Sequence, residues 1–181
     1  MSTAGPHFSI PSRLLHWLMA VLLLAMLFIG AGMAATVSDR YSLLLSIHRP
    51  LGIAILILVM LRFANRLISP PPPLPDTLPP IQRLAAHASH LLLYALMFIM
   101  PLVGWGMLSA GGYPIVLYGP WHLPPILPQD AELYAVLRQS HTVLAYLLFA
   151  TFLAHLAAAL FHGLIRRDGV LESMASLAVE K

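Results

Sequence analysis

The chain has 181 residues, of which 59% are hydrophobic and only 9% are charged, whereas a soluble domain carries about a quarter charged residues. This composition excludes an ordinary water-soluble fold and predicts that lipid surrounds most of the chain. There is no cysteine, which excludes disulfides, iron–sulfur clusters and thiolate-ligated metals; the nine histidines are the natural alternative ligands for a transition metal.

Four apolar segments are long enough to cross a membrane as helices, which takes about 20 residues each. In chain order they cover roughly 13–37, 42–66, 84–109 and 131–166. The second and third are joined by a connector, 70–80, whose seven prolines are incompatible with the interior of a helix or strand. A loop at 111–130, rich in proline and aromatic residues, precedes the fourth segment and is expected at the membrane interface. The sequence therefore predicts an all-α fold, an integral membrane four-helix bundle forming a single domain over residues 1–181.

The basic residues indicate the orientation of this bundle. An even number of spans places both termini on one side, together with seven basic residues, and leaves three on the other side. The seven are Arg13, Arg62, Arg66, Arg83, Arg166, Arg167 and Lys181, and the three are Arg40, Arg49 and Arg138. Basic residues favour the cytoplasmic side, so we expect cytoplasmic N- and C-termini. The positive net charge is thus a topology signal, and the lipid bilayer, not nucleic acid, is the expected partner.

Four histidines fall at two depths of the membrane. His141 and His155 lie fourteen residues apart on the fourth span, which separates them by about 21 Å and returns them to nearly the same helix face. By depth, His48 of the second span matches His141, and His16 of the first span matches His155. A single histidine in a span is more readily explained by an interhelical hydrogen bond than by metal binding. Two matched pairs instead predict two haem b groups, each clamped from both faces by histidine, and favour electron transfer over oxygen binding.

Three other histidines lie toward the side of the termini. His87 and His90 share a face at the start of the third span, where they could ligate metal but are better placed to hydrogen-bond haem propionates or a substrate. His162 follows His155 by seven residues and could donate a hydrogen bond to a quinone head group, or simply face water at the interface. Gly52 and Gly104 are small enough for a flat ring to approach, although close helix packing is the better explanation of each glycine taken singly.

The histidines belong to a series of short motifs in a definite order. The series consists of Leu15-His16-Trp17, His48 to Gly52, Arg62 to Arg66, the proline connector, His87 to His90 followed by Tyr94, Pro101 and Gly104, and finally His141 and His155. Together these resemble the bacterial cytochrome b561 family over nearly the whole chain. The resemblance implies a multi-pass cytochrome of the bacterial inner membrane with two haem b groups, whose four axial ligands match His16, His48, His141 and His155.

Compact members of that family are similar to superoxide:ubiquinone oxidoreductases, so the resemblance implies superoxide as a periplasmic electron donor and ubiquinone as acceptor. Arg49 and Arg138, close to the outer ligands, would attract such a small anion; both could also pair with haem propionates or phospholipid. The alternative is a non-catalytic subunit that relays electrons between quinone and a partner redox protein, but the short tails favour a protein without an obligate protein partner. A third hypothesis is a histidine-lined metal transporter without haem.

Overall fold

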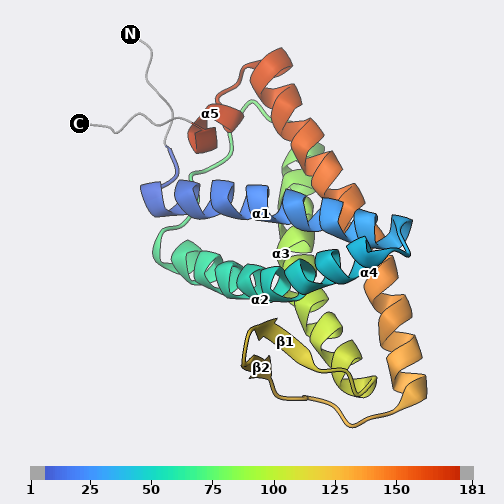
Figure 1. Cartoon of the computed structure of the whole chain (residues 1–181). Helices are drawn as coiled ribbons and strands as arrows, with labels where there is room; N and C mark the ends of the chain where they lie inside the picture. The colour runs from blue at the N-terminus through green and yellow to red at the C-terminus, as the bar shows by residue number, and fades with distance from the viewer. Residues whose placement is uncertain (1–6, 176–181) are drawn as a thin grey trace.

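Four long helices form the fold of the computed structural model, which describes residues 7–175 (Figure 1). They are α1 (Ile10–Ala35), α2 (Asp39–Ile68), α3 (Pro80–Ala110) and α4 (Ala131–Leu160). Each is long and apolar enough to cross a membrane, which confirms the predicted all-α membrane bundle. Lys181, counted above in the charge balance, lies outside the described residues.

Three of the helices begin earlier than the apolar pattern indicates, because polar residues and proline cap them. Ser9 accepts a hydrogen bond from the Ser12 amide at the start of α1, and Ser38 caps α2 in the same way through Arg40. Helix α3 begins at Pro80, within the proline-rich connector. Proline is tolerated in a first turn, where its missing N–H has no intrahelical partner.

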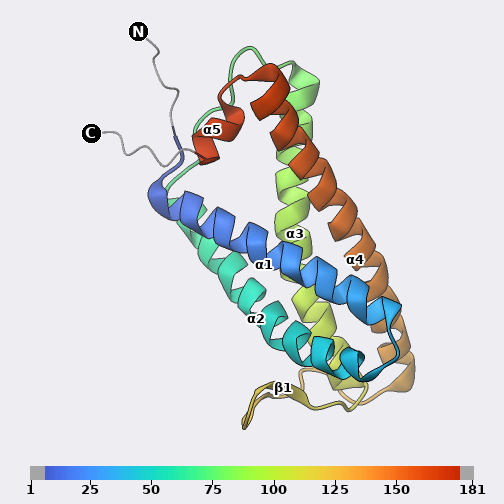
Figure 2. The ribbon, with the colours of Figure 1, turned by 45° about the horizontal axis from the view of Figure 1, so that its top comes forward.

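The helices pack as two antiparallel pairs, α1 along α2 and α3 along α4, and the pairs join mainly through α2 and α3 (Figures 1 and 2). All four contribute to one apolar core, which consists of Met19, Leu23, Ile55, Leu56, Val59, Leu93, Leu96, Met97 and Leu148. Leu148 lies halfway between His141 and His155 along α4. The core therefore forms a dry layer between the two histidine depths, while many large apolar side chains face outward, as expected for contact with lipid.

The two ends of the bundle differ in ways that the sequence did not predict. The loop after α3 contains a short antiparallel hairpin of β1 (Ile115–Tyr118) and β2 (Trp121–Leu123). At the other end, α4 continues into a π-helical turn, η1 (Phe161–Arg166), and a short helix, α5 (Val170–Ala175). Helix α5 folds back toward α1, because the Trp17 indole donates to the Met174 carbonyl at 3.1 Å. We call these the hairpin end and the terminal end (Figure 2).

Candidate functional site

The structure brings the four predicted histidines together in two pairs. At the terminal end, the ring centres of His16 on α1 and His155 on α4 are 6.3 Å apart. At the hairpin end, those of His48 on α2 and His141 on α4 are 6.1 Å apart. All four rings are half-buried between helices. Helix α4 supplies one histidine to each pair, so its length sets the separation of the two sites. We refer to the terminal pair and the hairpin pair.

The spacing within each pair suits one metal ion between two rings. An imidazole nitrogen binds a metal at about 2.0–2.1 Å and lies about 1.1 Å from its ring centre, so two rings on opposite sides of one ion have centres about 6.2–6.4 Å apart. The observed 6.3 and 6.1 Å agree with this separation. The ring-centre distances are therefore compatible with one iron between the two rings of each pair.

Two protein ligands at each site favour haem over a bare ion. A structural zinc ion takes four protein ligands, yet residues 7–175 contain no group of three or more metal-binding side chains that could hold an ion. A porphyrin supplies the four remaining ligands of an iron bound by two histidines. The pair of histidines at each site therefore fits haem.

The hairpin pair is closely surrounded by its neighbours. Within the described part of the chain, the Nδ1 atom of His48 is buried and makes no hydrogen bond. A Cβ atom on Gly104 would lie only 3.2 Å from the His141 ring, so even a methyl group at this position of α3 would push that ring away. Arg49 is half-buried and donates to the Pro114 carbonyl at 3.4 Å, which ties α2 to the hairpin. Arg138, one turn before His141, is exposed.

A third histidine, His90, lies beside the terminal pair, and its position could not be predicted from membrane depth alone. The ring centre of His90 lies 5.3 Å from that of His155, nearer than His16. This distance is shorter than two rings on opposite sides of one metal ion require, so His16 is the better partner for His155 in that arrangement and His90 packs beside the pair. His87 is exposed, and its Nδ1 bonds to the Arg83 carbonyl of its own helix at 2.7 Å.

His162 belongs to a separate polar cluster at the terminal end. Its Nδ1 lies 2.7 Å from the Asp168 carboxylate, which also accepts from Arg166 at 3.2 Å. Arg166 in turn donates to Gln82 of α3 at 2.6 Å. Asp168 was not predicted as a site residue from the sequence, because it lies beyond the apolar run. The chain returns it to His162 after the π-helical turn, through the left-handed backbone of Arg167 (φ 51°).

Comparison with known proteins identifies the family. The model of the prokaryotic cytochrome b561 family matches residues 7–176. The chain belongs to this family. It is therefore a bacterial membrane protein of electron transfer, and the family implies that it binds haem b.

Several curated relatives of this cytochrome have related names. Cytochrome b561 homolog 2 of Escherichia coli (strain K12) is 31% identical over 170 residues, covering 92% of this chain and 90% of that protein. The probable superoxide oxidase CybB of Yersinia pestis is 30% identical over 128 residues, or 71% of this chain and 72% of that protein. Cytochrome b561 homolog 1 of E. coli (strain K12) is 28% identical over 143 residues, 76% of this chain and 77% of that protein.

Proposed function

We propose that this cytochrome is a superoxide:ubiquinone oxidoreductase with two haem b groups. The observation that carries the proposal is the presence of two histidine pairs, each at the spacing of one iron, at the two ends of a membrane-spanning bundle. The similarity to a relative named as a probable superoxide oxidase supports superoxide as the donor. In the net reaction, two superoxide anions each lose one electron to become dioxygen, and ubiquinone takes up two electrons and two protons to become ubiquinol.

The histidine pairs would hold the two haems. When bound, haem b supplies an iron that gains and loses one electron at a time. His16 with His155 would hold one haem and His48 with His141 the other, and iron held by two histidines is suited to electron transfer instead of dioxygen binding. The apolar core between the pairs excludes water from the middle of the bundle.

The hairpin end would receive the donor on the periplasmic side. Arg49 and Arg138 place two positive charges close to the ligands of the hairpin pair. A local positive potential raises the encounter rate with a small anion such as superoxide. Arg138 is exposed and available for this role, whereas half-buried Arg49 also holds the hairpin in place. Pairing of either arginine with a haem propionate or with phospholipid is compatible with the same role.

The terminal end would bind ubiquinone on the cytoplasmic side, which requires two protons for each quinone reduced. Because Asp168 engages Nδ1 of His162, Nε2 is the ring atom that would face a quinone oxygen. Asp168 and Arg166 hold the orientation of the ring, and His162 could pass a proton from Nε2 to the bound quinone.

The test uses the purified protein in lipid nanodiscs with a short-chain ubiquinone and an enzymatic source of superoxide. We expect ubiquinol formation that stops when superoxide dismutase is added. A His141→Ala variant should lose this reaction. A haem-loaded protein that superoxide fails to reduce, and that copurifies with a stoichiometric redox partner, would instead favour the non-catalytic relay subunit.

A further inference from the structure

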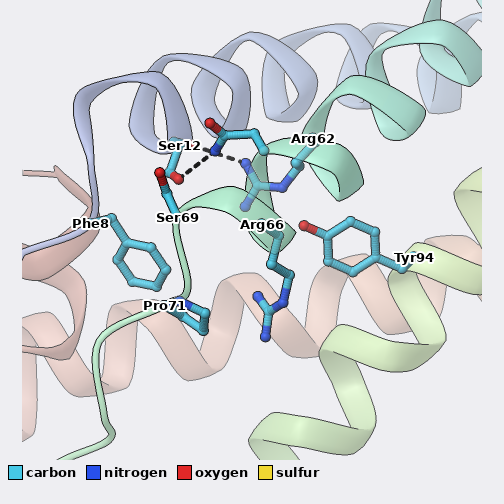
Figure 3. A pocket seen from close by; sticks show the side chains of 8 residues that line it. Phe8, Ser12, Arg62, Arg66, Ser69, Pro71 and Tyr94 are labelled. Atoms are coloured by element: carbon cyan, nitrogen blue, oxygen red, sulfur yellow. Dashed lines mark hydrogen bonds between the residues drawn. The ribbon is translucent and has the colours of Figure 1, made fainter.

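A pocket with two positive charges lies at the terminal end, where α1, α2 and α3 meet (Figure 3). Arg62 and Arg66 contribute the charges, and Ser12, Asn65 and Tyr94 line the same space. The two arginines are four residues apart on α2 and so share one helix face. Their guanidinium groups lie 6.0 and 5.8 Å from the centre of the Tyr94 ring, so both charges converge on one side chain.

These charges have no acidic partner in the part of the chain that the structure describes. The ion pairs found there involve Arg83 and the cluster around Asp168, and neither Arg62 nor Arg66 takes part in one. Arg62 donates to neutral groups, the Ser12 carbonyl at 3.2 Å and the Tyr94 hydroxyl. Both arginines are half-buried in a membrane-spanning helix, where an uncompensated charge is costly. The pocket is therefore suited to an anion.

The pocket is next to the terminal pair. Ser12 precedes His16 by four residues on α1, so the two lie one turn apart on the same face. Arg62 is close enough to interact electrostatically with both His16 and His155. A haem held between those rings carries two propionate carboxylates on one edge, and a guanidinium group binds a carboxylate through two parallel hydrogen bonds.

We propose that Arg62 and Arg66 bind the propionates of the terminal haem. The inference rests on the proposed function, because it requires a haem at the terminal pair. A quinone head group has no charge and would leave both arginines uncompensated. A phospholipid phosphate offers the same oxyanion chemistry as a propionate, and the experiment below separates these two sources.

The experiment measures how fast the terminal haem is lost to apomyoglobin from protein in nanodiscs. The His48→Ala background leaves one haem to follow. We expect Arg66→Gln to speed haem loss about tenfold, the loss typical of one charge-assisted hydrogen bond. Arg66→Lys, which keeps the charge, should have a smaller effect. Arg167→Gln, an exposed arginine at the same end, is the matched control and should have none.

Reconstitution with haem dimethyl ester, whose propionates are blocked, identifies the anion. If the arginine binds a propionate, Arg66→Gln and the parent protein should lose the ester at equal rates. Equal acceleration for haem and its ester would overturn the inference. So would acceleration that depends on exchanging phosphatidylcholine for phosphatidylglycerol in the nanodisc, because it would assign the site to a lipid phosphate. If the His48→Ala protein holds no haem at all, the terminal pair does not bind haem, and this result would contradict the proposed function itself.

Discussion

Replacing Gly104 by alanine tests how closely the hairpin pair is built. The added Cβ would lie 3.2 Å from Cε1 and 3.5 Å from Nδ1 of His141. Carbon atoms in contact are normally about 3.5–4.0 Å apart, so the ring must retreat by about 0.3 Å or more. Metal–ligand distances vary by only about 0.2 Å around their usual values. Alanine at position 104 therefore moves His141 out of the place from which it would share an iron with His48.

The Gly104→Ala substitution should change fold stability and haem binding in opposite directions. Glycine to alanine within a helix stabilises the fold by about 0.5–1 kcal/mol, so the variant without haem should be at least as stable as the parent. A disturbed ligand environment typically weakens metal binding by about 10–100-fold. Gly52→Ala is the matched control on α2, because its Cβ would meet only the flexible end of Met26 at 3.7 Å, an ordinary contact.

The assay is the haem content and the rate of haem transfer to apomyoglobin, with thermal unfolding of the haem-free proteins measured in parallel. We expect Gly104→Ala to weaken haem binding at the hairpin pair about 10-fold and to leave the terminal pair unchanged. Gly52→Ala should bind both haems as the parent does. If Gly104→Ala retained both haems as tightly as Gly52→Ala, the reasoning about space beside His141 would be refuted.

Two further predictions concern the donor and acceptor ends. The double variant Arg49→Gln, Arg138→Gln should lower the rate of oxidation of superoxide about tenfold at low ionic strength, and stopped-flow traces should show the difference shrinking as salt is added, whereas Arg40→Gln at the same end should have little effect. Asp168→Asn should slow steady-state quinone reduction at least about tenfold by releasing His162 while haem content stays unchanged; an equal rate would remove His162 and its partner from the acceptor site.

The four membrane helices could be predicted because their length and apolarity follow directly from the thickness of a bilayer. The histidine pairs could be predicted for a similar reason, since residue number along a helix fixes depth in the membrane. In the structure His141 lies beside His48, and His155 beside His16, as their depths predicted. Helix caps such as Ser9 and Ser38 could have refined the helix starts, which the apolar pattern placed too late.

The contacts that could not be predicted from the sequence depend on how the helices are rotated against one another and on where the chain reverses direction. Predicting the contact of His90 with His155 requires the rotation of α3 relative to α4, and membrane depth does not give this rotation. The contact of Asp168 with His162 depends on a π-helical turn and on one residue with a left-handed backbone, and both lie at or beyond the end of the apolar run. The pocket of Arg62 and Arg66 combines three helices, and on sequence alone these two arginines indicated only the orientation of the chain in the membrane.

The most direct test of the account is the reduced-minus-oxidised spectrum, with haem quantitation, of His48→Ala and His155→Ala beside the parent protein. Two haems in the parent and one in each variant, with the remaining haem spectroscopically distinct in the two cases, is the outcome we expect. A colourless parent protein, or variants that keep both haems, would contradict the assignment of two iron sites to the two histidine pairs.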